Sequence, residues 1–130
     1  MGLKSKYELE YSFNTPVRVL YERLSTPEGL SEWFADEVIA TNDIFVFKWH
    51  GVEARARKTV AKENKLVRFE WIDFDGSEEN SFSFEITTHE LTGDTALIIT
   101  DYAEIDEKDD AIYLWDTQIA RLKTILGLSL

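Results

Sequence analysis

The sequence predicts an α+β fold: an antiparallel sheet of about six strands, with two short helices after the first strand and one long C-terminal helix on the same face. Between residues 43 and 105, apolar and polar side chains alternate, as they do along half-buried strands. Near the C-terminus the apolar spacing changes to that of an amphipathic helix. Strands of this pattern have one apolar face, so we expect the helices to cover that face and water to cover the other.

The N-terminal segment is expected to form one strand and two short helices. The strand is indicated by apolar side chains at every second position: Tyr7, Leu9, Tyr11 and Phe13. We expect Thr15 to cap the first helix and Pro16 to occupy its first position, because the first turn leaves its N–H groups unpaired and proline has none. Thr26 and Pro27 repeat this signal, which predicts a second short helix that continues to Phe34.

Five further strands are expected between the helices and the C-terminal segment. Their inward positions include Phe45, Phe47 and Trp49; Ala54 and Ala56; Val67, Phe69 and Trp71; Phe82, Phe84 and Ile86; and Leu97 and Ile99. Turn residues separate them at His50-Gly51, Glu63-Asn64-Lys65, Asp75-Gly76-Ser77 and Thr92-Gly93-Asp94. The outward positions are polar and of mixed charge: Arg55, Arg57, Arg68, Glu70, Ser83 and Glu85. The pattern therefore predicts an antiparallel meander with a solvated outer face.

The C-terminal segment has the clearest helical signal. Its apolar stripe consists of Ile112, Trp115, Ile119, Leu122 and Leu126. Acidic residues between Asp106 and Asp110 precede it, which suits the positive end of a helix dipole, and Gly127 supplies a stop. We expect this helix to be long enough to lie across the whole sheet.

Composition limits the function classes. The 130 residues contain 14 Lys+Arg and 25 Asp+Glu, a formal net charge of −11, which argues against nucleic acid and anionic membranes as partners. The chain has no cysteine, so disulfides, thiolate metal sites and cysteine nucleophiles are excluded. We expect a single domain over residues 1–130, without a signal peptide or stable membrane insertion, in the cytoplasm. The surplus of aromatic side chains in so short a chain is compatible with a homodimer.

Three segments resemble a known family. The stretch from Ser25 to Asp36 resembles the helix-turn signature of the START-like superfamily, also called SRPBCC or Bet v-type, and is closest to its heat-shock-chaperone ATPase activator homologues. Leu66 to Trp71 resembles the middle strand of that branch, and Ala111 to Leu128 its C-terminal helix. The resemblance implies a helix-grip fold, in which the sheet wraps around the C-terminal helix. In many relatives the space between them is a hydrophobic cavity for lipids, sterols or other apolar molecules.

An aromatic set on the inward face is the candidate ligand site. Ligand pockets are concave, mostly apolar and rich in aromatic rings. The expected lining consists of Trp33, Phe34, Phe45, Phe47, Trp49, Phe69, Trp71, Phe82, Phe84, Trp115, Ile119 and Leu122. The alternative is that these large rings fill the space between the sheet and the C-terminal helix and leave no cavity.

Asp101 is the most notable polar candidate. It alternates with Leu97 and Ile99 along one strand and so shares their inward face. Its carboxylate would therefore lie in the cavity or at its rim, where burial raises a carboxyl pKa. Lys58 has inward parity on another strand and is a candidate partner. Together they are expected to anchor the polar end of a ligand, whereas the alternative for Asp101 is a rim position in water.

No metal or catalytic centre is predicted. His50 and His89 lie in or beside turns without a third ligand at workable spacing, and turn chemistry explains the segment from Asp73 to Gly76 better than a calcium loop does. The sequence shows no cofactor motif and no catalytic dyad. We therefore expect a module that binds a small apolar or amphipathic, lipid-like ligand without catalysis. The alternatives are a chaperone-cofactor-like module that binds a protein partner, and a cyclase- or hydrolase-type enzyme that uses Asp101.

Overall fold

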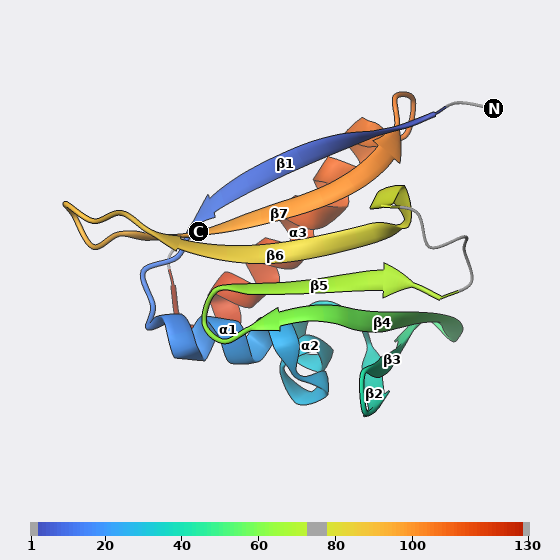
Figure 1. Ribbon diagram of the computed structural model, residues 1–130, viewed down its shortest axis with the longest axis horizontal. Coiled ribbons are helices and arrows are strands. Elements are labelled where there is room, and N and C mark those ends of the chain that lie inside the picture. Colours follow the sequence, from blue (N-terminus) through green and yellow to red (C-terminus); the bar gives the residue numbers. More distant parts are fainter. Residues whose placement is uncertain (1–2, 73–77, 129–130) are drawn as a thin grey trace.

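The computed structural model describes residues 3–72 and 78–128 (Figure 1). Its elements are, in chain order, β1 (Lys4–Ser12), α1 (Val17–Ser25), α2 (Pro27–Trp33), β2 (Glu37–Thr41), β3 (Ile44–Trp49), β4 (Val52–Lys62), β5 (Leu66–Trp71), the 3₁₀ turn η1 (Glu78–Asn80), β6 (Ser81–Thr88), β7 (Thr95–Glu104) and α3 (Lys108–Ile125). The predicted turn at Asp75-Gly76-Ser77 and the segment from Asp73 to Gly76 lie outside the described residues.

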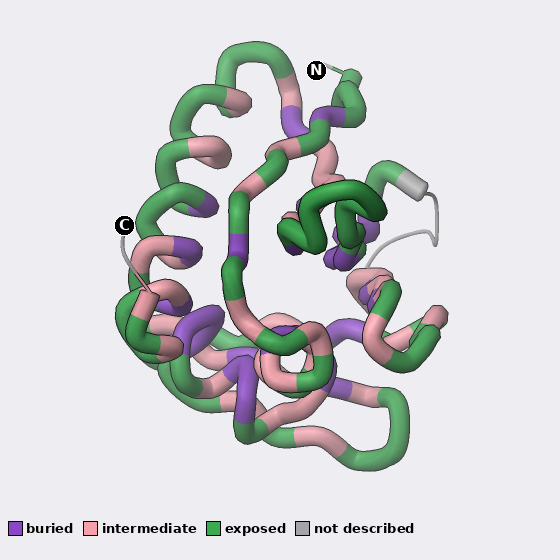
Figure 2. The backbone as a smooth tube through the Cα atoms, turned by 90° about the vertical axis from the view of Figure 1, so that its left-hand side faces the viewer, coloured by how far each residue is buried: buried purple, intermediate pink, exposed green. Residues whose placement is uncertain are grey.

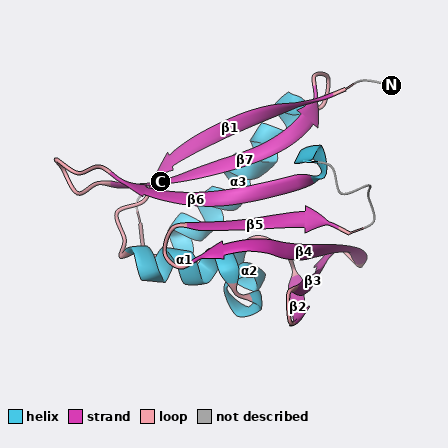
Figure 3. Ribbon diagram, viewed as in Figure 1, coloured by secondary structure: helices cyan, strands magenta, loops and turns pink. Residues whose placement is uncertain are grey.

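The strands form one antiparallel sheet in the order β1-β7-β6-β5-β4-β3-β2. The N-terminal strand β1 pairs with the last strand, β7, and this pairing places Tyr7 opposite Asp101. Figure 1 shows α3 running diagonally behind the sheet, and Figure 3 shows α1 and α2 at the lower side of this view, where α1 contacts β5 and β6 and α2 contacts β2 and α3. The α+β helix-grip architecture predicted from the sequence is therefore confirmed.

The sheet has seven strands, one more than expected. The additional strand is β2, which pairs with β3 through contacts such as Val38 opposite Phe47. It is short, follows α2 after three residues, and forms the edge of the sheet. Because an edge strand has only one neighbour, Ile39 remains half exposed, and the pattern of this strand is weak in the sequence.

The two predicted helix starts differ in outcome. Pro16, in an extended conformation, is the residue that precedes α1, and no side chain caps this helix, so the expected cap at Thr15 is wrong. Pro16 itself stands at the cap position, one residue before the first helical position expected for it, and its ring holds φ at −57°, a value that the first turn of a helix also uses. At α2 the prediction is confirmed, because Thr26 Oγ1 accepts a 3.0 Å hydrogen bond from the N–H of Gly29 and Pro27 occupies the first turn.

The long helix follows its predicted stripe. Trp115, Ile119 and Leu122 are buried against the sheet, and Gly127 ends the helix with φ +74°. Figure 2 shows that the buried positions of α3 lie on its inner side and the exposed ones on its outer side. Within residues 3–72 and 78–128, no helix combines the length and the apolar character that crossing a membrane would require.

The β3–β4 connection is the turn predicted at His50-Gly51. Both residues have positive φ, +49° and +83°, which is the geometry of a tight two-residue hairpin turn. The N–H of His50 donates a 2.8 Å hydrogen bond to Oδ2 of Asp36, and this bond ties the turn to the segment that follows α2. The turn therefore holds the end of β3 close to the helical layer.

Candidate functional site

A largely apolar groove lies at one end of the space between the sheet and α3. It lies between the N-terminal half of α3 and the ends of β3 and β5, and has a volume of about 440 Å³. Its lining consists of Phe34, Trp49, His50, Trp71, Asp101, Ala111, Leu114, Trp115 and Gln118. Apolar walls with a few convergent polar groups are the usual form of a small-molecule site.

Phe34, directly after α2, is the centre of the aromatic wall. Its ring stacks on Trp115 with centroids 5.7 Å apart, and Trp49 meets it edge-on at 5.3 Å. Its carbonyl oxygen accepts hydrogen bonds from Trp49 Nε1, at 2.7 Å, and from Gln118 Nε2, at 2.8 Å. Since these bonds join β3, α3 and the end of α2, the rings are held in a fixed arrangement.

Asp101, on β7, is the carboxylate of the groove. Its Oδ2 accepts a hydrogen bond from Trp115 Nε1, at 2.9 Å, and another from the hydroxyl of Tyr7, at 3.2 Å. Its Oδ1 accepts a 2.8 Å bond from the N–H of Tyr102. Burial raises the pKa of Asp101 above its ordinary value, although these hydrogen bonds and the positive charge of Lys4 act in the opposite direction.

The phenol of Tyr7 belongs to the same cluster. Burial is the main reason that its pKa is raised, and the neighbouring carboxyl group of Asp101 adds to the effect. Tyr7 is therefore a hydrogen-bond donor to Asp101 over the whole physiological pH range. Tyr7 is the residue of β1 directly opposite Asp101 of β7, so the contact follows from the pairing of these adjacent strands.

The structure divides the predicted lining residues into two groups. Phe34, Trp49, Trp71 and Trp115 line the groove. The others lie deeper in the core or along α3: Trp33, Phe45, Phe47, Phe69, Phe82, Phe84, Ile119 and Leu122. Their rings contact one another at centroid distances such as 5.1 Å for Phe45 with Phe69 and 5.2 Å for Phe69 with Phe82. The aromatic residues therefore both fill the interior of the grip and form a groove at its mouth.

Lys58 and Asp101 are not brought together. Nζ of Lys58 lies 3.5 Å from the carbonyl oxygen of Ser25 and 5.3 Å from the ring centroid of Phe45. Lys58 is on β4, three strands from β7, which separates the two backbones by about 14 Å at the usual strand spacing. Lys58 therefore contacts the C-terminal end of α1 and the ring of Phe45.

Sequence reasoning missed four lining residues: His50, Ala111, Leu114 and Gln118. The last three lie on one side of α3 at helical spacing, beside the buried stripe that was predicted. The spacing was a usable signal, but it could not show which flank of the stripe faces the open end of the grip. His50 was assigned to a turn, and the turn itself forms part of the rim.

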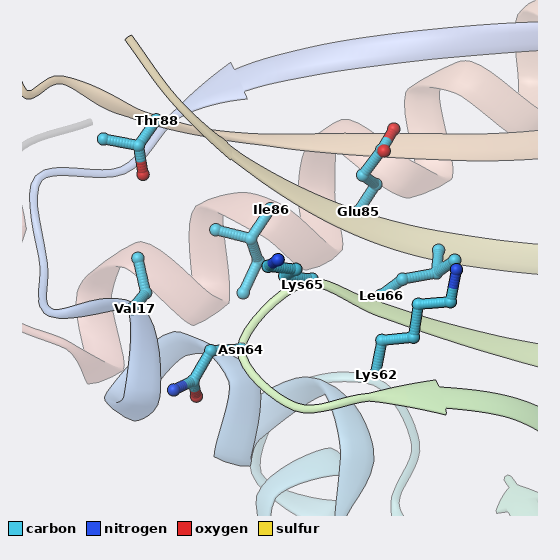
Figure 4. Close-up of a pocket in the computed structure, with 8 residues that line it drawn as sticks. All are labelled: Val17, Lys62, Asn64, Lys65, Leu66, Glu85, Ile86 and Thr88. Atoms are coloured by element: carbon cyan, nitrogen blue, oxygen red, sulfur yellow. The ribbon is translucent and has the colours of Figure 1, made fainter. Parts of the chain in front are cut away.

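A second hollow, of about 490 Å³, lies at the other end of β5 (Figure 4). Its lining comes from α1, the β4–β5 turn, β5 and β6: Val17, Lys62, Asn64, Lys65, Leu66, Glu85, Ile86 and Thr88. Figure 4 shows Lys62 and Glu85, of opposite charge, on its walls. It has no aromatic side chain, so the groove beside Asp101 is the better candidate for an apolar ligand.

The two histidines are far apart in the fold. His50 lies on the rim of the groove, whereas His89 follows β6 and donates its N–H to the carbonyl oxygen of Asp94 at 2.8 Å. In the part of the chain that the structure describes, no three His, Cys, Asp or Glu side chains gather as a metal site would require.

The sheet wraps around the C-terminal helix, and the groove lies at one end of the space between them. This architecture is that of the helix-grip class of ligand-binding or interaction modules. The family model of the START-like superfamily domain matches residues 1–128, and this chain belongs to that superfamily. The resemblance predicted from the segment Ser25 to Asp36 is thus confirmed.

Solved structures of similar fold support this assignment. Protein BfR322 from Bacteroides fragilis, solved by NMR, is 36% identical, with a TM-score of 0.69 over 100% of this chain and 96% of that chain. The Aha1 dimer from Colwellia psychrerythraea is 18% identical, with a TM-score of 0.74 over 92% of this chain and 93% of that chain. Protein MLL2253 from Mesorhizobium loti is 15% identical, with a TM-score of 0.75 over 95% of this chain and 97% of that chain. The latter two similarities concern the fold alone.

A comparison with curated proteins found no match.

Proposed function

We propose that this protein binds a small apolar or amphipathic molecule in the groove between α3 and the ends of β3 and β5, without catalysis. The observation that supports the proposal is the groove itself, of about 440 Å³, with four aromatic rings and one carboxylate in its lining. Small-molecule sites usually measure about 300–1,000 Å³ and combine apolar walls with few polar groups. The groove has the size and chemistry of such a site.

Binding of a neutral fluorescent probe tests this proposal. N-phenyl-1-naphthylamine is uncharged at neutral pH and becomes strongly fluorescent in apolar surroundings. We expect saturable binding to the wild-type protein at one site. Leu114 lines the groove and is 57% exposed, so Leu114→Gln removes apolar contact without disturbing the core. This substitution is expected to weaken probe binding by about threefold to tenfold.

Leu91 provides the matched control. It is 92% exposed in the turn between β6 and β7, away from the groove, so Leu91→Gln should leave probe binding unchanged. Equal melting temperatures of the two variants would show that both fold. A wild-type protein that does not bind the probe, or equal losses in the two variants, would contradict the proposed site.

A further inference from the structure

We propose that the natural ligand of the groove is an apolar amine, whose protonated nitrogen lies against Asp101 while its carbon skeleton lies on the aromatic wall. This inference rests on the proposed function and names the chemical class of the ligand. It follows from three properties of the groove: the hydrogen-bonding capacity that remains there, the character of its walls, and the charge around Asp101.

The hydrogen-bonding capacity left beside Asp101 is that of an acceptor. Trp49 and Gln118 donate to the carbonyl of Phe34 and Trp115 donates to Asp101, whereas the indole N–H of Trp71 makes no hydrogen bond to the described residues. A carboxylate can accept about four hydrogen bonds, and Asp101 accepts three from Tyr7, Tyr102 and Trp115. Asp101 can therefore accept one more, and a ligand that donates a hydrogen bond fits this position.

The walls also favour a cation. The faces of Trp, Tyr and Phe rings attract ammonium groups, and the attraction is strongest for Trp. Three of the four rings in the lining are tryptophans: Trp49, Trp71 and Trp115. The same rings contact the apolar part of an amphipathic molecule, so one wall serves both halves of an amine.

Asp101 lacks a protein cation as an ion-pair partner among residues 3–72 and 78–128. Two lysines lie in its surroundings. Nζ of Lys4 donates to Asn80 Oδ1 at 3.2 Å, and Nζ of Lys108 lies 5.8 Å from the ring centroid of Tyr7. His50 is the other ionisable group of the lining and is exposed on the rim.

A ligand ammonium would supply the direct partner that Asp101 lacks. Its charge would lower the pKa of the carboxyl group and favour the ionised form. A ligand carboxylate would instead meet a like charge in a protein whose net charge is already −11.

Three ligands of equal chain length test the inference: n-decylamine, 1-decanol and sodium decanoate. Each is titrated at pH 7, below its micellar concentration, against the protein saturated with N-phenyl-1-naphthylamine. We expect decylamine to displace the probe with an affinity about tenfold or more above that of decanol. Decanoate should bind more weakly than decanol.

Asp101→Asn is the matched variant. Asparagine keeps an oxygen that can accept from Trp115 and Tyr7, but it removes the negative charge. We expect decylamine to lose about tenfold in affinity on this variant and decanol to lose clearly less, because the alcohol can donate a hydrogen bond to residue 101 but carries no charge. The preference for the amine would then disappear.

The outcomes separate the two proposals. If the probe does not bind the wild-type protein, the proposed function fails. If the probe binds but the three compounds displace it equally, or decanoate is preferred, the groove is a ligand site and the assignment of an amine is overturned. An amine preference that survives Asp101→Asn also overturns it, because the charge of Asp101 would then play no part.

Discussion

Trp115 on α3 donates a 2.9 Å hydrogen bond from its indole nitrogen to Oδ2 of Asp101 on β7. Tyr7 on β1 donates to the same oxygen at 3.2 Å, so one carboxylate oxygen joins the long helix α3 to the neighbouring strands β1 and β7. These groups lie next to the candidate ligand groove, and Asp101 and Trp115 form part of it. The stability of the helix–sheet contact and the chemistry of the site therefore depend on the same atoms.

Trp115→Phe removes the donor of this bond and keeps an aromatic ring in contact with Phe34. We expect the free energy of unfolding to fall by about 1–3 kcal/mol, because a partly buried carboxylate loses a partner. Trp71→Phe is the control, since Trp71 makes ring contacts to Phe47 and Phe82 without an indole hydrogen bond to the described residues. Urea unfolding of both variants measures the difference, and equal losses would show that ring size alone matters.

Asp101 should make stability depend on pH. Burial raises the pKa of its carboxyl group in the folded protein above the ordinary 3.8, so the folded state holds this proton more tightly than the unfolded state. Between the unfolded and folded pKa values, rising pH therefore lowers the free energy of unfolding through this group. Relative to the wild type, Asp101→Asn should become steadily more stable as the pH rises above about 4, and level off once the folded carboxyl group is ionised.

Urea unfolding of the wild type and Asp101→Asn at a series of pH values measures this difference, in which the contributions of the other carboxylates cancel. A difference that does not change with pH would mean that Asp101 has the same pKa in both states.

Thr26 should stabilise the junction between α1 and α2. Its Oγ1 accepts from the N–H of Gly29 at 3.0 Å and donates to the carbonyl of Glu22 at 2.8 Å. Thr26→Ala should lower the free energy of unfolding by about 1 kcal/mol, the usual value for the loss of such a cap. Thr26→Ser keeps the hydroxyl and should retain most of the stability. Thermal melting would refute the role of the hydroxyl if serine and alanine had the same effect.

Arg68 and Phe69 are adjacent on β5 but lie on opposite faces of the sheet. Phe69 is fully buried, so Phe69→Ala should cost about 3–5 kcal/mol. Arg68 lies on the outer face, with its guanidinium 3.3 Å from Glu70 Oε2, and Arg68→Ala should cost less than about 1 kcal/mol. Denaturant unfolding of the two variants tests which face is covered, and comparable losses would contradict the assignment.

The faces of the strands could be predicted from the sequence because alternation is a local property. The positions of Phe45, Phe47, Phe69 and Phe84 followed from parity alone, and all are buried. Parity also placed Lys58 on the inward side, where it contacts Ser25 and Phe45. The amphipathic stripe likewise oriented α3, and Thr26-Pro27 located the start of α2.

Which inward-facing residues come close together, and which of them line the groove, could not be predicted in the same way. Asp101 and Lys58 share inward parity, yet their distance depends on the order of four strands, which alternation does not specify. Whether Phe34 and Phe84 line a groove or fill the core depends on how α2, the sheet and α3 approach one another. That approach is a property of tertiary packing, and no short motif encodes it.

The aromatic rings that fill the interior between the sheet and α3 affect how fast a bound ligand is released. A molecule bound in the groove as proposed, against Phe34 and Trp115, would keep one side in water instead of being enclosed by the protein. Its release then requires no opening of the core, so we expect exchange within milliseconds to seconds and loss of the ligand during purification. Such a protein would respond to the momentary concentration of its ligand, and would be poorly suited to carrying it over long distances.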